Sequence, residues 1–349
     1  MRCAPSNPTR PSRRRPIERH PDLRILIVKL SSLGDVVHTM PVVHDIRMAY
    51  PDALIDWVVE PGFAPLVRRV AGIHATVECA LRRWRKGWWK AQVHDEWALF
   101  RDAIRSRPYD AIIDFQGLTK SALIARMARG PRYGIANRTE GASHEWPARW
   151  LVDHAVAIEP HIHALDRARV LAAQVFGYPL EGPPVFGLQS HLLESTERTL
   201  VFVHGSSRED KLWPEAHWVE IGRRATGAGW QIALPQAGRE EFERAERIAR
   251  AIGPAAEVWP AMGLDALADR MGAAHGVIGV DSGLSHIAVA LDLPHVQIYN
   301  HPTAWRTGPL PEHGHAYQAS VQGRPTPGID SVWQAWQQVW AQYRLVSRR

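Results

Sequence analysis

A small-residue loop follows a strand-like run in each half of this chain, and these two loops limit what it can fold into. Ser31–His38 follows the apolar run Ile25–Leu30, and Asp281–His286 follows Val277–Val280. Such a loop between a buried strand and a helix places backbone N–H groups and the positive end of the helix dipole at the carboxyl edge of a sheet. Open α/β sheets bind ligands at that edge. The sequence therefore predicts a ligand held between two doubly wound domains.

Strand-like and helix-like segments alternate through both halves, which predicts two domains with parallel sheets. In the first half, strands are expected at 25–30, 54–59, 76–79 and 111–114, and helices near 36–49, 63–69, 93–105 and 163–176. In the second half, strands are expected at 200–203, 231–234, 257–259, 276–280 and 295–299, and helices at 215–228, 240–252, 264–274 and 284–290.

The domain boundaries follow from this alternation and from a Pro-rich linker around 182–184. We expect a disordered basic tail at 1–22, a first domain at 23–185, a second domain at 195–325 and a C-terminal helix at 329–345. Trp333, Trp336 and Trp340 recur at helical spacing, which indicates one apolar face of that helix. The tail holds six arginines against two acidic residues and so carries +4 of the formal net charge of +6.

Composition and missing motifs exclude several classes of protein. Cys3 and Cys79 are too few for a disulfide framework or a metal cluster. The sequence has no run of 18 apolar residues, no apolar core of a secretory signal, and neither the dinucleotide nor the P-loop glycine motif. His161 and His163 are a loose pair that we expect at the surface rather than on a metal ion.

A basic cluster at 82–90 combines five cations and three tryptophans with no acidic residue. It fits a surface loop whose aromatic side chains pack on the body. It also fits nucleic-acid binding, because aromatic side chains between cations can stack on bases. A third interpretation is recognition of an anionic substrate by arginines, with the tryptophans at a membrane interface. The residues alone do not rank these three.

Three constellations at strand ends could carry chemistry. Asp35 lies in a strand-to-helix loop, where a carboxylate can accept a proton or can cap the helix as its N-cap residue. The segment His204–Pro214 carries small hydroxyl residues and Lys211, which are suitable donors for a diphosphate leaving group. The third is Asp281–His286, which precedes a predicted helix whose amides can face an anion.

At these residues the chain resembles the lipopolysaccharide heptosyltransferases of glycosyltransferase family 9, from about residue 24 to about 310. The matching motifs are SSLGDVVHTMP at 31–41, DWVVE at 56–60, RRWRKGWW at 82–89, IDFQGLTKSA at 113–122, DKLWPEAHW at 210–218 and VDSGLSHIAVALD at 280–292. RRWRK with QGLxKSA is similar to the first heptosyltransferase of the pathway rather than to the second. The resemblance implies the GT-B architecture, with two Rossmann-like doubly wound α/β domains facing across a cleft.

The resemblance also implies a reaction and its partners. The family transfers L-glycero-D-manno-heptose from ADP-heptose to Kdo of Kdo-lipid A, with inversion, no required metal and no cofactor. A membrane-lipid acceptor implies a peripheral protein at the cytoplasmic face of the inner membrane. Rival hypotheses are a heptosyltransferase II or related heptose transferase and, in another class, a nucleic-acid-binding protein, although no nucleic acid is expected as partner.

The site residues implied by the resemblance fall into four groups. The catalytic residues are Asp35, as general base, and Lys211. The donor-binding residues are Ser206, Ser207, Glu241, Met262, Asp281, Ser282, Gly283, Leu284 and His286. The acceptor-binding residues are Arg82, Arg83, Arg85, Lys86, Gln116 and Lys120. Ser31, Ser32 and Gly34 form a phosphate-binding loop.

Two positions depart from the family pattern. Gln236-Ala237 stands where the family has Trp-Gly before the glutamate, which puts the placement of Glu241 in question. Asn300-His301-Pro302-Thr303 stands where the family has Tyr-Gly-Pro-Thr, and His301 adds a side chain where glycine is usual. Both departures are expected to alter the local geometry around the donor.

Overall fold

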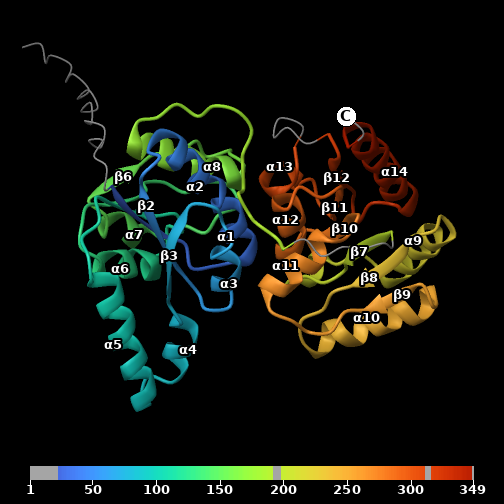
Figure 1. Cartoon of the computed structure of the whole chain (residues 1–349), viewed down its shortest axis with the longest axis horizontal. Helices are drawn as coiled ribbons and strands as arrows, with labels where there is room; N and C mark the ends of the chain where they lie inside the picture. Colours follow the sequence, from blue (N-terminus) through green and yellow to red (C-terminus); the bar gives the residue numbers. More distant parts are fainter. Residues whose placement is uncertain (1–22, 192–197, 311–315, 348–349) are drawn as a thin grey trace, which may run out of the picture.

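The computed structural model describes residues 23–191, 198–310 and 316–347, which form two α/β domains side by side (Figure 1). In the described part of each domain, six parallel strands form one sheet, ordered β3-β2-β1-β4-β5-β6 in the first domain and β12-β11-β10-β7-β8-β9 in the second. In both sheets the chain starts at an inner strand and moves outward in each direction in turn, which is the doubly wound arrangement. The predicted fold class is confirmed.

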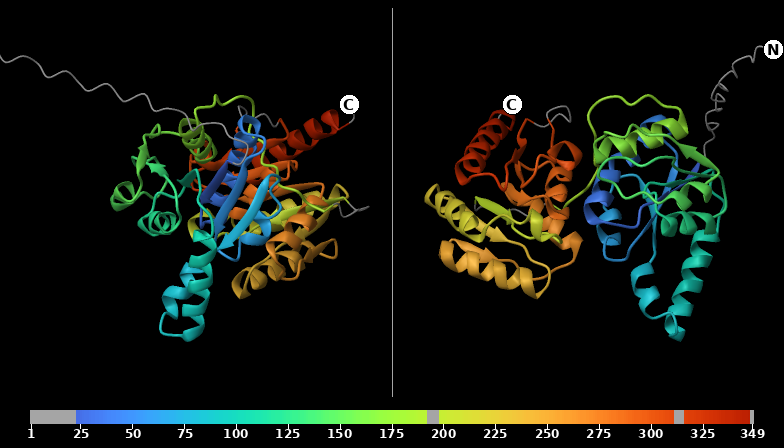
Figure 2. Two further views of the ribbon diagram at one scale, coloured as in Figure 1. Left: turned by 60° about the vertical axis from the view of Figure 1, so that its left-hand side comes forward. Right: turned by 180° about the vertical axis from the view of Figure 1, so that it is seen from behind.

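The first domain has these elements: β1 (Arg24–Val28), α1 (Leu33–Thr39), α2 (Pro41–Ala49), β2 (Leu54–Val59), α3 (Ala64–Val67), β3 (Ile73–Glu78), α4 (Leu81–Lys86), α5 (Ala91–Arg105), β4 (Ala111–Asp114), α6 (Thr119–Met127), β5 (Arg132–Ile135), α7 (Trp146–Trp150), β6 (His154–Val156) and α8 (Ala164–Phe176). Helices α4 and α5 extend from the body of this domain as an arm, which points downward in Figures 1 and 2.

The second domain has these elements: β7 (Thr199–Val203), the 3₁₀ helix η1 (Glu209–Lys211), α9 (Glu215–Gly227), β8 (Gln231–Leu234), α10 (Arg239–Ile252), β9 (Ala256–Val258), α11 (Leu264–Gly272), β10 (Gly276–Val280), α12 (Gly283–Ala290), β11 (His295–Tyr299), α13 (Ala304–Thr307), β12 (Gln318–Gln322) and α14 (Ile329–Val346). The helix expected at 329–345 is α14, and its Trp336 is buried while Trp333 and Trp340 pack beside it.

Some predicted elements differ from the structure. The helix expected at 36–49 is two helices, because Pro41 has no N–H to donate to Val37 and begins α2 as its first residue. The strand expected at 25–30 ends at Val28, and the one expected at 76–79 is longer, Ile73–Glu78. Three short strands, β5, β6 and β12, were not predicted. The tail at 1–22 and the expected domain start at 195 lie outside the described residues.

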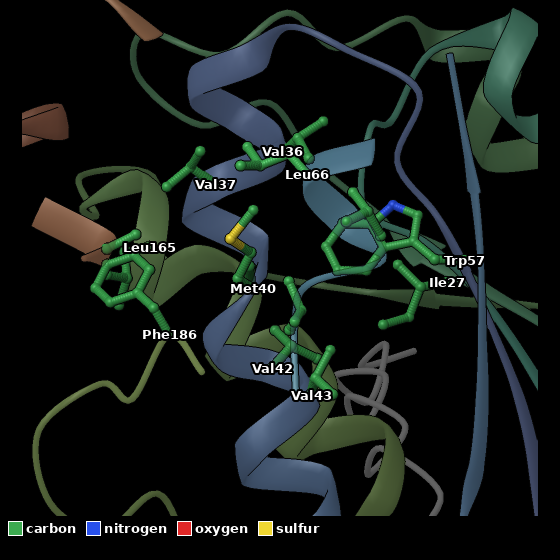
Figure 3. Close-up of a cluster of buried hydrophobic side chains, with 14 of the residues drawn as sticks. Ile27, Val36, Val37, Met40, Val42, Val43, Trp57, Leu66, Leu165 and Phe186 are labelled. Carbon is green, nitrogen blue, oxygen red and sulfur yellow. The ribbon is translucent and has the colours of Figure 1, made fainter. Parts of the chain in front are cut away.

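An apolar cluster joins the two domains where α1 meets α12. It includes Val36, Val37 and Met40 from the first domain and Ile287 and Ala288 from the second, all buried. Figure 3 shows its first-domain part, with α1 and α2 between the β-sheet side chains Ile27 and Trp57 and the linker-side residues Leu165 and Phe186. This packing fixes the N-terminus of α1 against the second domain, which positions the site described next.

Candidate active site

Asp35 lies in the first turn of α1, at the carboxyl end of β1. The N-cap residue is Ser32, whose backbone N–H and hydroxyl both donate to Asp35 Oδ2, at 3.2 and 2.8 Å. The interpretation of Asp35 as the N-cap is therefore wrong, because it occupies the third helical position of a capping box. Only one of its oxygens takes part in the box, and Oδ1 faces the cations described below.

Two cations from different elements face Asp35 Oδ1. The buried Lys29 ammonium lies 3.7 Å away and also donates to the Phe115 carbonyl, while Arg167 of α8 lies 3.9 Å away and donates to Thr139 Oγ1. Burial alone would raise the pKa of Asp35, but the Lys29 charge, the Ser32 hydroxyl and Arg167 together hold it below its usual range. Asp35 is thus a carboxylate at neutral pH, and its side chain is still 38% exposed and open to a substrate.

The loop of Asp35 touches the second domain directly. A Cβ on Gly34 would come 2.7 Å from His286 Cδ2, and a Cβ on Gly283 would come 2.7 Å from Leu33 Cγ. Both glycines are therefore required by a close approach between the starts of α1 and α12. His286 Nε2 lies in turn 3.5 Å from Asp281 Oδ1. The two loops predicted from the sequence meet across the domain boundary.

The donor-binding residues predicted in the loop at 281–286 differ in burial and in hydrogen bonding. Ser282 is the N-cap of α12, but its hydroxyl is buried without a hydrogen-bond partner among the described residues. Leu284 is partly buried against the joint core. Ser31, on the facing loop, is buried and precedes the capping box.

Asp281 and Lys211 form an ion pair at the end of the second sheet. The Lys211 ammonium lies 2.7 Å from Asp281 Oδ2, and Thr307 Oγ1 lies 3.5 Å from Asp281 Oδ1. Burial would raise the pKa of Asp281, but His286 and Lys211 hold it well below its usual range. Lys211, Asp281 and Thr307 line a cavity together with Arg208, Asn300, His301 and Arg306.

A neighbouring cavity holds the other predicted donor residues. Ser206, Ser207 and Glu241 line it, and η1 contributes Glu209 to this cavity and Lys211 to the first one. The two cavities are adjacent, and the prediction that both serines and Lys211 hold the donor phosphates stays a prediction. Met262 lines neither cavity and packs against the joint core instead.

Both departures from the family pattern leave the residues in question at the site, since Glu241 and His301 each line one of the two cavities. Ala237 donates its N–H to Glu241 at 2.7 Å, and burial raises the pKa of Glu241. Asn300 donates to the carbonyls of Asp210 and Leu212, at 2.9 Å each, and so fixes the C-terminal end of η1 relative to β11. His301 lines the Lys211 cavity.

Residues 82–86 of the basic cluster belong to helix α4 rather than to a loop, but Trp84 packs on the body as the surface-loop interpretation expected. Trp84 is buried and donates to Glu96 of α5, which also pairs with Arg83. Arg82 lies 3.9 Å from Glu60. Arg85 and Lys86 are exposed and have no carboxylate within 4 Å among the described residues.

The other predicted acceptor residues follow β4. Gln116 accepts the Leu30 N–H at 2.9 Å, which places it beside the residues that directly follow β1. Lys120 lies in the first turn of α6 and acts electrostatically on Glu60 and Glu145. The loop is held by the buried Asp114, which accepts the N–H groups of Gln116 and Gly117.

Sequence reasoning missed several residues of this site. His163 is buried rather than at the surface: it accepts the Leu165 N–H through Nδ1, so its Nε2 carries the proton and donates to the Gly308 carbonyl of the second domain. His38 lies between His163 and His286, with ring centroids 5.7 and 4.3 Å away. Lys29 and Arg167, the two cations that face Asp35, were also missed. The sequence signal that could have found them is a cation within an apolar run, in a strand for Lys29 and in a helix for Arg167.

Two further findings concern metals and membranes. Across residues 23–191, 198–310 and 316–347, no three His, Cys, Asp or Glu side chains are grouped so that they could hold a metal ion. Within the same ranges, no helix is long and apolar enough to span a bilayer.

Comparison with known proteins identifies the family. The sequence model of glycosyltransferase family 9 (heptosyltransferase) matches residues 97–334. The chain belongs to glycosyltransferase family 9. It is 38% identical over 283 residues to lipopolysaccharide heptosyltransferase 1 of Escherichia coli K12, covering 79% of this chain and 88% of the relative. It is 36% identical to the enzyme of the same name from Pseudomonas aeruginosa, over 82% of this chain and 81% of the relative.

Comparison with solved structures points to the same family. The E. coli heptosyltransferase WaaC with ADP superimposes with a TM-score of 0.77 and 33% identity, over 93% of this chain and 99% of that one. The same enzyme with ADP-2-deoxy-2-fluoro heptose gives a TM-score of 0.75 at 34% identity, over 93% and 100%. The protein is thus a glycosyltransferase of the GT-B type, and the resemblance seen in its motifs is confirmed.

Proposed function

We propose that this protein transfers L-glycero-D-manno-heptose from ADP-heptose to a Kdo residue of Kdo-lipid A, with inversion at the anomeric carbon. The observation that carries the proposal is the exposed Asp35 carboxylate, held by Lys29 and Arg167. It lies where the first domain meets the loop at 281–286 of the second domain, which we call the donor loop. The identity of 38% to a heptosyltransferase 1, against 24% to heptosyltransferase 2 of E. coli K12, favours the first transferase.

Each step of the reaction has a residue to perform it. Asp35 takes the proton of the attacking Kdo hydroxyl, whose oxygen forms a bond to the anomeric carbon. The bond from that carbon to the phosphate oxygen breaks on the opposite face, and ADP leaves with the electron pair. Lys211 stabilises the negative charge that grows on the diphosphate, and the neighbouring serines orient the donor. The reaction needs no metal ion and no cofactor in this proposal.

The acceptor reaches Asp35 from the side of the first domain. The arm of α4 and α5 offers Arg82, Arg85 and Lys86 to the carboxylates and phosphates of the lipid, which guanidinium groups match with paired hydrogen bonds. Trp88 and Trp89 are exposed on the turn between α4 and α5, where indoles can rest at a membrane interface. We propose that the protein is peripheral, at the cytoplasmic face of the inner membrane, and the exposed indoles support a contact with a membrane surface.

The test is mass spectrometry of the lipid product. The purified protein is incubated with ADP-heptose and either Kdo-lipid A or the same lipid already carrying one heptose. The proposal expects one added heptosyl residue on Kdo-lipid A and none on the heptosylated lipid. Addition to the heptosylated lipid alone would show a second-step transferase instead. A chain that modifies neither acceptor but binds single-stranded nucleic acid with steep salt dependence would support the rival class.

A further inference from the structure

Helix α13 of the second domain contacts the first domain through two consecutive side chains. Trp305 stacks on His161, with ring centroids 3.8 Å apart and planes 23° apart. Arg306 donates from Nη2 to the carbonyl of Gly141 at 2.6 Å. This short helix is thus a second place where the two domains are joined, in addition to the α1–α12 contact.

Arg306 also lines the cavity that contains Lys211 and Asp281. The next residue, Thr307, reaches Asp281 Oδ1 at 3.5 Å and Tyr299 at 3.1 Å, which fixes the C-terminal end of α13 to the donor loop. One guanidinium therefore borders both the donor cavity and a first-domain backbone carbonyl.

The charges in this cavity are unevenly paired. Arg208 donates to Asp210 at 2.9 Å, and Lys211 is paired with Asp281 at 2.7 Å. Arg306 has no carboxylate within 4 Å among the described residues, and its hydrogen bond to Gly141 occupies one of five N–H groups. Among the three cations that line the cavity, Arg306 is the one whose charge no carboxylate of the described residues offsets, and most of its N–H groups are available to bind an added anion.

We propose that Arg306 binds the diphosphate of the nucleotide-sugar donor while it stays docked on Gly141. The inference rests on the proposed function for its ligand, and it adds a phosphate-binding residue that depends on the first domain. Gly141 is essential to this arrangement, since its φ of 70° suits glycine and a Cβ there would overlap the Arg306 guanidinium. Donor binding and domain contact are then coupled through one side chain.

Calorimetric titration of the full chain tests the assignment. The probes are ADP and, without phosphate, adenosine. The variants are Arg306→Gln, Arg306→Lys, Gly141→Ala and the double variant Arg306→Gln/Gly141→Ala. The control is Arg223→Gln, because Arg223, among the described residues, also donates only to a backbone carbonyl, that of Ala251, and lines neither donor cavity. Arg306 is half-buried and has no carboxylate to orphan, so its replacement by Gln is compatible with folding.

We expect Arg306→Gln to weaken ADP binding by about tenfold or more, as for one lost charge-assisted hydrogen bond, with adenosine unchanged. Arg306→Lys should recover part of the loss. Gly141→Ala should weaken ADP binding by displacing the guanidinium, and it should add almost nothing in the Arg306→Gln background. Arg223→Gln should bind as the wild type does.

The outcomes separate this inference from the proposed function. If the wild type binds ADP and Arg306→Gln binds it equally well, the inference is overturned and the proposed function stands. Equal losses for ADP and adenosine would also overturn it, because the contact would not be to phosphate. If Gly141→Ala remains fully damaging in the double variant, Gly141 does not act through Arg306. A wild type that does not bind ADP overturns both.

Discussion

Ionisation of the buried Asp114 should destabilise the protein as the pH rises. Asp114 ends β4 and accepts the N–H groups of Gln116 and Gly117. Ser121 Oγ lies 2.9 Å from its second oxygen and 2.8 Å from the Leu118 carbonyl. The single hydroxyl proton of Ser121 can serve only one of these oxygens, and a protonated Asp114 would donate to Ser121 while Ser121 donates to Leu118.

The size of the effect follows from the pKa. Burial raises the pKa of Asp114 from 3.8 to about 6. Because the folded value is the higher one, the fold binds this proton more tightly, and the stabilisation is present below the unfolded pKa and lost as pH rises through about 6. The gap corresponds to about 3 kcal/mol at roughly 1.36 kcal/mol per pH unit.

The perturbation is Asp114→Asn, whose amide can accept from Gln116 and donate to Ser121. Chemical denaturation at a series of pH values gives the difference in unfolding free energy between wild type and variant. The variant should gain on the wild type by up to about 3 kcal/mol between about pH 4 and pH 7. Asp52→Asn, which removes an exposed carboxylate, controls for net charge. A difference independent of pH, or one that favours the wild type increasingly as pH rises, would refute the reasoning.

Two further predictions concern substrates. Lys211→Met should lower kcat by about 10² without changing the acceptor KM, because the Lys211 charge acts on the leaving diphosphate. Steady-state kinetics with both substrates varied measures both constants, and a change in the acceptor KM alone would contradict this prediction. Replacing Arg82, Arg83 and Arg85 by Gln should raise the acceptor KM by about tenfold, the modest effect expected of exposed charges. Calorimetry should show ADP-heptose binding unchanged, and an unchanged acceptor KM would remove the arm from the acceptor site.

The fold could be predicted where a strand is buried on both faces. Such strands appear in the sequence as mostly apolar runs, and Leu54–Val59, Ala111–Asp114 and Gly276–Val280 coincide with β2, β4 and β10. The outer strands β6 and β12 could not be found in this way. β6 has only three residues, and β12 (QASVQ) is largely polar, so neither appears in the sequence as an apolar run.

The site could be predicted where it is local. Asp35 and Asp281 lie in loops that directly follow strands, so the topology alone brings them to the sheet edges. Lys29, Arg167 and Arg306 could not be assigned, because their partners come from distant parts of the chain. Only tertiary packing shows that the basic residue of one helix faces the carboxylate of another.

The central claim is that Asp35 is the general base of heptosyl transfer. Its most direct test is single-turnover transfer from ADP-heptose to Kdo-lipid A by Asp35→Asn, with ADP affinity measured on the same preparation. Asn can still accept from Ser32, so the helix start is preserved. Asp153→Asn, which alters a carboxylate paired with Arg132 at the opposite edge of the first sheet, is the control.

We expect Asp35→Asn to bind ADP as the wild type does and to transfer heptose about 10² to 10⁴ times more slowly. Its residual rate should no longer fall at acid pH, because the group that must lose a proton is gone. Asp153→Asn should react at the wild-type rate. A folded Asp35→Asn protein that transfers heptose at close to the wild-type rate would contradict the account.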